Sequence, residues 1–271
     1  MPELPEVETT RRGIAPVLEG HCVNKLVVRE RRLRWPVPDG LEDLLCGQVI
    51  RHVERRAKYL LLETANGTAM VHLGMSGSMR IVDATEPPES HDHFDIVVVG
   101  GDVVRFNDPR RFGSLLWAGL SPEDHPLLAE LGPEPLSDEF TGEYLWQSAR
   151  GRRVAIKQHV MNSKIVAGVG NIYANESLFR AGIHPGRAAG RIALPRMRKL
   201  ADEIRAVLTE AIRQGGTTLR DYRGGDGKPG YFKQQLLVYE RGGEPCKRCR
   251  KPLKQIMQGQ RATYYCGTCQ R

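Results

Sequence analysis

The sequence has no long hydrophobic run, and aromatic residues make up only 6% of its 271 positions. Its longest apolar runs, YLLL and IVVV, are far too short to span a bilayer, so we expect no membrane partner. The first twenty residues contain three prolines and four glutamates and lack the apolar core of a secretory signal. These absences predict a soluble, cytoplasmic protein. In that reducing compartment, six cysteines favour metal binding or free thiols over disulfides.

The charge of the chain is unbalanced and clustered. It carries 40 Lys and Arg against 32 Asp and Glu, which gives a formal net charge of +8. The basic residues gather in short segments that read RERRLRW, RHVERRAK, DPRRF, ARGRR and CKRCRK. Net charge alone is compatible with a role in solubility. Clustering favours a polyanionic partner, with nucleic acid as the leading candidate.

The first half of the chain has the pattern of a β-sandwich. A short helix is expected over residues 4–12, where Gly13 ends it. Short runs rich in Val, Ile and Leu then follow between Cys22 and Trp117. Asn66-Gly67 and Gly100-Gly101-Asp102 separate several of these runs and are typical of tight hairpins. Many short strands joined by hairpins predict two packed antiparallel sheets.

The second half of the chain is expected to be mainly helical. A helix capped by Ser121 and ended by Gly132 is predicted first, followed by a proline-containing linker over 132–140. Further helices are expected near 142–149, 153–162, 171–181 and 195–214, and a possible strand at QLLVYE, residues 235–240.

Four cysteines near the end have the spacing of a metal site. Cys246 and Cys249 form one Cys-x-x-Cys pair, Cys266 and Cys269 form another, and sixteen residues separate the pairs. Four thiolates in this pattern predict tetrahedral zinc with no open position, and therefore a structural role. About 25 residues are too few for a core of their own, so the metal is expected to supply folding energy.

Two glycine-containing stretches are candidates for DNA contacts. In KIVAGVGNIYANESLF, Gly168 and Gly170 precede a helical pattern, where backbone amides can approach a phosphate. With Lys157 nearby, DNA backbone binding is favoured over an ordinary helix–turn–helix link. Met75 in HLGMSGSM and Phe112 in NDPRRFG are apolar residues on turns. Such residues either pack internally or fill a gap in a DNA stack, and spacing alone favours neither interpretation.

The opening MPELPEVET places Pro2 and Glu3 at the tip of the chain. Removal of Met1 frees a secondary amine that can attack a sugar C1′ and form an iminium ion, which is cationic without a proton. That ion is an electron sink: it weakens the C2′ proton and allows β-elimination of the 3′ phosphate, then δ-elimination of the 5′ phosphate. Glu3 would be the neighbouring acid/base group. From these residues alone, a simple lead-in to a helix is the favoured interpretation.

Motifs along the whole chain change that balance. The segments MPELPEVETTRRGI, RRAKYLLL, HLGMSGS, HDHFD, DPRRFG, LGPEPL, AGVGNIYANESLF, AGIHP, GGTTLRD, GKPGYF and QRATYYC, with the paired cysteines, resemble bacterial formamidopyrimidine-DNA glycosylases. The family removes 8-oxoguanine and ring-opened purines from double-stranded DNA. The resemblance implies an α+β protein. Its parts are a catalytic β-sandwich (1–131), a linker (132–140), a DNA-binding helix–two-turn–helix domain (141–220), a lesion loop and connector (221–240) and a zinc finger (241–271).

The same resemblance implies residue roles. Pro2 is the Schiff-base nucleophile, Glu3 the proton donor for base loss, Lys58 the donor for β-elimination and Arg261 the residue linked to δ-elimination. DNA contacts are implied for the following residues: His91, Arg110, Arg152, Lys157 and Asn171. Met75, Arg110 and Phe112 match the void-filling set. One departure is Glu240, where a glycine is common, which leaves the local turn before the zinc module in doubt.

Two alternatives remain. Endonuclease-VIII-like glycosylases act on oxidised pyrimidines with the same Pro2 and Glu3 chemistry, but their opening usually reads MPEGPE; Leu4 and the DPRRF motif favour the purine branch. A non-catalytic zinc-containing DNA-binding protein would need the basic clusters but no imine-forming terminus. No segment specifies an oligomer interface, so a monomer is expected.

Overall fold

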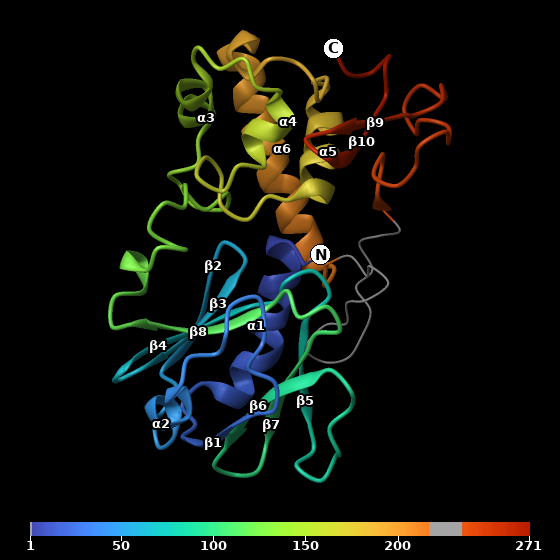
Figure 1. The fold of residues 1–271 in the computed structure, drawn as a ribbon. Coiled ribbons are helices and arrows are strands. Elements are labelled where there is room, and N and C mark those ends of the chain that lie inside the picture. Colours follow the sequence, from blue (N-terminus) through green and yellow to red (C-terminus); the bar gives the residue numbers. More distant parts are fainter. Residues whose placement is uncertain (1, 217–234) are drawn as a thin grey trace. The chain divides into compact units, whose positions relative to one another are not determined.

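The computed structural model describes residues 2–216 and 235–271, which divide into two compact units (Figure 1). The first unit contains residues 2–130 and 214–216, and the second contains residues 131–213 and 235–271. The family-implied lesion loop at 221–240 lies mostly outside the described residues. Within the described part, no helix is both long and apolar enough to cross a membrane.

The first unit begins with helix α1, Leu4–Leu18. The prediction that it ends at Gly13 is wrong. Gly13 costs roughly 1 kcal/mol inside a helix. Ile14 and Leu18 are both fully buried in the core beyond it, and each buried aliphatic side chain contributes about 1.5–3 kcal/mol. Burial therefore outweighs the local stop signal, and α1 contacts strands of both sheets of this unit.

Two four-stranded antiparallel sheets form the rest of the first unit, which confirms the predicted sandwich (Figure 1). One sheet has the order β1-β6-β7-β5 and the other β2-β3-β4-β8. The strands are β1 (Val23–Val28), β2 (His52–Arg56), β3 (Tyr59–Thr64), β4 (Gly67–His72), β5 (Ser78–Val82), β6 (Asp92–Val98), β7 (Val103–Asn107) and β8 (Ser114–Gly119). A short helix, α2 (Leu41–Leu45), follows β1.

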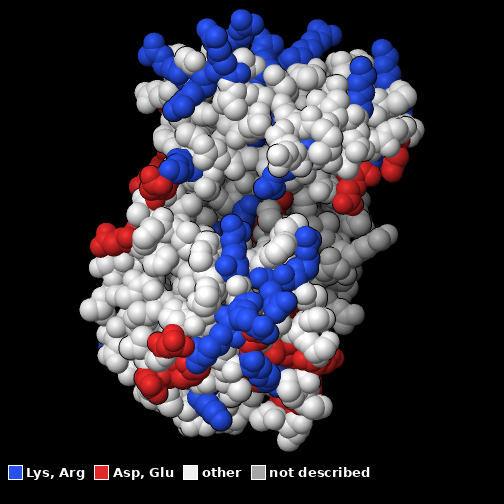
Figure 2. Space-filling view, in the orientation of Figure 1, with Lys and Arg blue, Asp and Glu red and all other residues white. Residues whose placement is uncertain are grey.

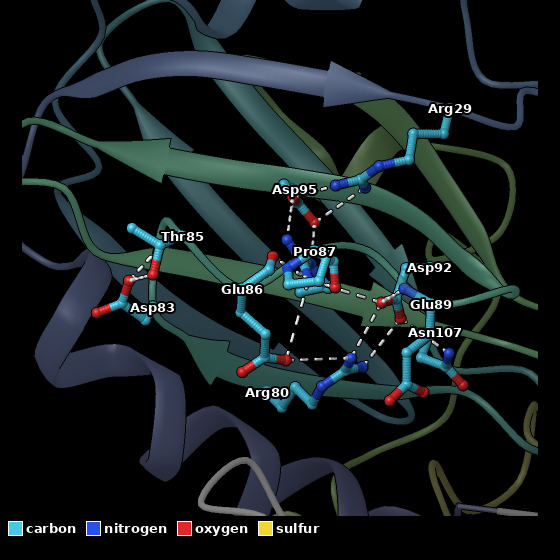
Figure 3. A network of polar contacts seen from close by, with 11 residues as sticks. Arg29, Arg80, Asp83, Thr85, Glu86, Pro87, Glu89, Asp92, Asp95 and Asn107 are labelled. Atoms are coloured by element: carbon cyan, nitrogen blue, oxygen red, sulfur yellow. Dashed lines mark hydrogen bonds and ion pairs between the residues drawn. The ribbon is translucent and has the colours of Figure 1, made fainter.

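The side of the first sheet that faces away from the core holds an ion-pair network (Figure 3). Arg105 is only 3% exposed and donates to both oxygens of Asp95 at 2.9 and 3.0 Å, while Arg29 binds the same carboxylate. Arg105 also donates to the carbonyls of Glu86 and Pro87 at 3.1 and 3.2 Å. Through these two bonds the network attaches the loop between β5 and β6 to the sheet. The bonds also complete the pairing of the buried Arg105 charge, and a buried charge left unpaired would be strongly destabilising.

The second unit is built on helices α3 (Gly142–Ala149), α4 (Ile156–Val160), α5 (Asn171–Ala181) and α6 (Leu194–Arg213), with the 3₁₀ turn η2 (Ala189–Arg191). Three of these match the expected ranges to within one residue, whereas α4 is shorter at both ends than the helix expected over 153–162. Residues 132–140 pack within this unit: Phe140 is fully buried, and Arg205 donates to its carbonyl at 2.9 Å. A hairpin of β9 (Lys254–Gln258) and β10 (Arg261–Tyr265) carries the C-terminal cysteines.

Two predicted elements are wrong. In place of a helix from Ser121 to Gly132 there is only the 3₁₀ turn η1, Pro122–Asp124. Pro126 has no N–H and disfavours helical backbone in the residue before it, and His125 is indeed extended, with φ −65° and ψ 133°. Residues 235–240 do not form a strand. Their N–H groups at 237–239 instead donate to the carboxylate of Glu176 on α5, each at 2.9 Å.

Candidate functional site

The N-terminal candidates lie at the start of α1. Pro2 is buried, and Glu3, only 1% exposed, is the N-cap of the helix. Glu3 and Glu6 form a capping box in which the Glu6 carboxylate accepts from the Glu3 N–H at 2.9 Å. Carboxylates at this end also interact favourably with the helix dipole. The box therefore gives the residue beside Pro2 a defined backbone position, although chain tips usually fray.

Lys58 occupies a strained two-residue turn between β2 and β3. Its neighbour Ala57 has φ 53°, in the left-handed region that a side chain disfavours. The Ala57 carbonyl accepts from Arg55 at 2.9 Å, and Arg55 also pairs with Glu8 of α1 at 3.3 Å. Arg55 thus ties the Lys58 turn to the first turns of the helix that Pro2 precedes.

Glu8 is the centre of that link. Arg11 and Arg12 donate to its carboxylate at 2.9 and 2.8 Å, in addition to Arg55. Burial by itself disfavours the charged carboxylate, but the hydrogen bonds from Arg11 and Arg12 outweigh it and hold the pKa of Glu8 below its ordinary value. Glu8 therefore stays ionised and keeps the start of α1 attached to the end of β2.

The strand register places the Lys58 turn beside two other loops. Tyr59 pairs with His72, and His72 pairs with Ser114, so these residues form one row across the end of the second sheet. Lys58 directly precedes Tyr59, and the loops that carry Met75 and Phe112 begin or end at the same row. In the first sheet, Asn107 pairs with both Ser78 and Asp92. His91 directly precedes Asp92, so it lies at the end of the sheet from which the same two loops extend.

Sequence patterns alone did not single out His72, although it begins the HLGMSGS motif. Its ring lies 4.9 Å from that of Tyr59, and its Nδ1 accepts from the Gly74 N–H at 2.9 Å. Burial lowers the pKa of His72 to about 4, and the charges of Lys58 and Arg34 act in the same direction. At neutral pH the imidazole is therefore uncharged and adds no repulsion next to Lys58.

The residues proposed to fill a DNA gap are exposed, as that role requires. Met75 is 39% and Phe112 41% exposed, while the Arg110 guanidinium lies 4.9 Å from the centre of the Phe112 ring. Exposed large apolar side chains next to a cation contrast with the packed interior of the sandwich. His91 is also exposed, with φ 142°. Figure 2 shows that Lys and Arg side chains form a band on the visible face of the first unit.

In the second unit the structure brings three candidates together around the hairpin. Lys157 is 1% exposed and donates its Nζ to the Ala262 carbonyl at 3.0 Å and to Thr263 Oγ1 at 2.6 Å. Asn171, the first residue of α5, donates to the same carbonyl at 3.1 Å. Arg261 is exposed beside them and helps to line a cavity of about 180 Å³ that Lys157 also borders.

Arg152 lies in a different part of this unit. It is exposed and borders an open cavity of about 460 Å³ together with Arg153 and Arg191. The structure therefore groups Arg152 with other arginines rather than with Lys157, Asn171 and Arg261.

The four cysteines have the geometry of a closed metal centre. Their Sγ atoms all lie within 4.8 Å of one another, with Cys246–Cys269 at 4.0 Å and Cys249–Cys266 at 3.4 Å. Tetrahedral zinc with bonds of about 2.3 Å requires sulfur separations of about 3.8 Å. The N–H groups of Arg248 and Cys269 donate to the sulfurs of Cys246 and Cys266, each at 3.4 Å, as outer partners of thiolate ligands do. The residues thus fit a structural zinc ion.

The departure at Glu240 lies in the turn before the zinc module. Glu240 has φ 58°, the left-handed conformation for which glycine is suited, and this explains why a glycine is common at this position. Nearby, Glu176 on α5 accepts the three N–H groups described above; in the sequence it is only a polar residue within a predicted helix. Burial raises the pKa of Glu176 despite those three bonds.

Fold and site together define a nucleic-acid-binding protein with a sandwich unit, a helical unit and a four-thiolate zinc finger. Three family models match the chain: the formamidopyrimidine-DNA glycosylase N-terminal domain over 1–115, its H2TH domain over 131–223, and the zinc finger found in FPG and IleRS over 243–271. The chain therefore belongs to the formamidopyrimidine-DNA glycosylase family.

Relatives and solved structures agree over the full length. The formamidopyrimidine-DNA glycosylase of Photobacterium profundum is 59% identical over 271 residues, covering all of both chains, and that of Stutzerimonas stutzeri is 58% identical with the same coverage. The crystal structure of the MutM (Fpg) protein of Thermus thermophilus matches with a TM-score of 0.89 and 38% identity, covering 99% of this chain and 98% of that one. The Lactococcus lactis Fpg in complex with abasic-site DNA matches with a TM-score of 0.92 and 30% identity, covering all of both chains.

Proposed function

We propose that this chain removes oxidised purines, such as 8-oxoguanine and formamidopyrimidines, from duplex DNA and then cleaves the abasic strand as a lyase. Family membership over the whole length is the observation that carries this proposal. The Lactococcus lactis relatives were solved with DNA that contains Fapy-dG and with DNA that contains an abasic site, which are the substrate and the intermediate of such a reaction.

Pro2 and Glu3 carry out the first step. The Pro2 nitrogen attacks C1′ of the damaged nucleotide, the bond from C1′ to the base breaks, and the base leaves with the bonding electrons and takes up the proton that the Pro2 nitrogen loses. Glu3 donates a proton to the sugar ring oxygen as the ring opens, which leaves an iminium ion on Pro2. The buried start of α1 and the capping box support these roles, because they fix the two residues side by side.

Lys58 and Arg261 act in the eliminations. The iminium draws electrons from the C2′–H bond, whose proton passes to water, and the 3′ phosphate leaves by β-elimination. Loss of the C4′ proton to water then drives δ-elimination of the 5′ phosphate. Lys58 serves the first elimination and Arg261 the second. The strained turn, in which Ala57 has φ 53°, supports a defined backbone position for Lys58.

The remaining candidates hold the DNA. Met75, Arg110 and Phe112 enter the space left by the extruded nucleotide. His91, Arg152, Lys157 and Asn171, with Arg110, bind the DNA; Lys157 and Asn171 also fix the hairpin that presents Arg261. The zinc stabilises that hairpin. We place the protein at the nucleoid in the cytoplasm because its substrate is there, and we expect it to act as a monomer.

Borohydride trapping tests the central claim. Wild-type protein with duplex DNA containing 8-oxoguanine opposite cytosine should give a covalent adduct, because borohydride reduces the iminium. Pro2→Gly should lower trapping and strand cleavage by about 100-fold or more while DNA affinity stays within a factor of a few. Pro5→Ala, a change in the same first turn, is the matched control and should trap normally.

Two results would redirect the proposal. Equal loss of binding and cleavage in Pro2→Gly would mean that the tip is structural, and absence of any adduct from the wild type would point to a non-catalytic DNA-binding protein. Faster cleavage of thymine glycol opposite adenine than of 8-oxoguanine opposite cytosine would assign the chain to the pyrimidine-specific branch.

A further inference from the structure

The two loops that carry Met75 and Phe112 are joined by a buried carboxylate. Asp108 follows β7 and is 0% exposed. Its Oδ1 accepts from the Ser76 hydroxyl at 2.8 Å, and its Oδ2 accepts from the Gly113 N–H at 2.8 Å. Ser76 is the neighbour of Met75, and Gly113 is the neighbour of Phe112, so one side chain connects both loops directly beside the exposed residues.

Further contacts of Asp108 enclose the second loop. The Arg110 N–H also donates to Oδ1, at 3.2 Å, so the carboxylate binds the backbone on both sides of Phe112. The backbone of Asp108 is held as well: its N–H donates to the His91 carbonyl at 3.0 Å, and its carbonyl accepts from His93 Nε2 at 2.7 Å. Asp108 is therefore held by hydrogen bonds at both its side chain and its backbone, as a residue that positions others must be.

The loops also touch each other without intervening side chains. A Cβ atom placed on Gly74 would lie 2.4 Å from the Gly113 nitrogen and 2.5 Å from the Phe112 carbonyl carbon. Gly74 has φ 66° and donates its N–H to His72 Nδ1 at 2.9 Å. The pairing of His72 with Ser114 brings these two segments together, and the Asp108 carboxylate adds hydrogen bonds to both loops just beyond that pair.

A side chain that enters a DNA stack needs such support. Opening a base step costs a few kcal/mol, so a flexible loop would retreat from the stack instead of opening it. A loop that is ordered beforehand loses little entropy on binding, and its side chain acts against a fixed backbone. Met75 and Phe112 are 39% and 41% exposed, yet the residue next to each is hydrogen-bonded to the fully buried Asp108 carboxylate, Ser76 through its hydroxyl and Gly113 through its N–H.

We propose that Asp108 is a positioning residue for the void-filling side chains: it sets the spacing of the Met75 and Phe112 loops so that both side chains enter the stack together. This inference rests on the proposed function of Met75 and Phe112. Because Asp108 is fully buried, it is inferred to act through the two loops and not on the DNA or the reacting atoms.

Asp108→Asn tests the inference because it keeps the shape and replaces one acceptor oxygen by a donor NH₂. On duplex DNA with 8-oxoguanine opposite cytosine, kcat/KM should fall by about 10- to 100-fold. On single-stranded DNA with an abasic site there is no base stack to open, and the rate of borohydride trapping should stay within about twofold of wild type. The fluorescence of 2-aminopurine opposite the lesion should also differ from that with wild type, since the gap is filled differently.

Matched variants make the outcome clear. Ser76→Ala removes one donor and leaves Asp108 intact, so it should show the same duplex-specific defect at a smaller size. Asp102→Asn is the same substitution at an exposed position next to the opposite end of β7 and should leave both substrates unaffected. Equal losses on duplex and single-stranded DNA in Asp108→Asn and Ser76→Ala would show general structural support only and would overturn the inference.

Phe112→Ala separates this inference from the function on which it rests. If Phe112→Ala slows the duplex reaction and Asp108→Asn does not, the positioning role is wrong and the void-filling role stands. If Phe112→Ala and Met75→Ala both leave the duplex reaction unchanged, the void-filling role itself is wrong and the positioning role fails with it.

Discussion

His72 should make the first unit sensitive to acid, and the size of the effect follows from its environment. Burial lowers the pKa of this imidazole from 6.5 to about 4 in the folded protein. The folded form therefore resists a proton that the unfolded chain accepts below pH 6.5. The stabilisation linked to this pKa difference is fully present above pH 6.5 and is lost as the pH falls toward 4. Below pH 4 it does not change further.

The magnitude can be worked out from those two values. Each unit of pKa difference corresponds to about 1.36 kcal/mol. At pH 8 the imidazole is neutral in both states and contributes nothing to the difference. At pH 5 the unfolded His72 is almost fully protonated and the folded one is almost fully neutral, which lowers the free energy of unfolding by about 2 kcal/mol.

The assay compares wild type with His72→Gln, which has no titratable ring, by urea unfolding at pH 8 and pH 5. Both are made in a Trp146→Phe background, so that Trp35 and Trp117 report on the first unit alone. The free energy of unfolding of the variant minus that of the wild type should rise by about 2 kcal/mol from pH 8 to pH 5. All other titrating groups cancel in this difference.

An independent reading comes from the NMR titration of the His72 ring, which should show little protonation at pH 5. A difference between variant and wild type that stays constant with pH, together with a ring that titrates near 6.5, would refute the assignment of His72 as a buried neutral imidazole next to Lys58.

Three further predictions concern stability. Removal of zinc by a chelator should release one ion per chain, unfold the β9–β10 hairpin and abolish tight DNA binding, while the urea midpoint of the first unit stays unchanged; a hairpin that keeps its structure without metal would contradict this. Glu240→Gly should raise the free energy of unfolding of the second unit by about 0.5–1 kcal/mol, because the relief of the left-handed backbone at φ 58° outweighs the extra chain entropy that glycine loses on folding. A decrease would show that the glutamate side chain contributes more than the backbone strain costs. Arg105→Leu should lower the free energy of unfolding, measured with urea, by about 3 kcal/mol, since the buried Asp95 carboxylate loses the hydrogen bonds that Arg105 donates to both of its oxygens. Arg32→Leu at an exposed site is the control and should lower it by less than about 0.5 kcal/mol.

Elements with local signals were predictable from the residues alone. Short runs rich in Val, Ile and Leu, separated by turn signals such as Asn66-Gly67, predicted the sandwich strands, because such residues favour strands and such turns favour hairpins. The helix at 195–214 was equally clear, since its apolar residues share one face and Gly215 follows it. The paired cysteines indicated zinc because thiolate spacing reflects tetrahedral coordination directly.

Long-range packing settled what local signals could not. Gly13 did not end α1, because the burial of Ile14 and Leu18 came from distant strands. Residues 235–240 did not become a strand, because a carboxylate from α5 binds their N–H groups. Both outcomes depend on partners far away in sequence, which no window of residues contains.

The same holds for the site. The motifs named Pro2, Lys58, Met75 and Phe112 one by one, but only the pairing of β3, β4 and β8 put the loops of the last three at one end of a sheet. Asp108 and His72 were invisible as functional residues, because their importance lies in what they contact. Residue type and spacing specify the chemistry of a group, whereas distance and burial, which set its pKa and its orientation, arise only when the chain has packed.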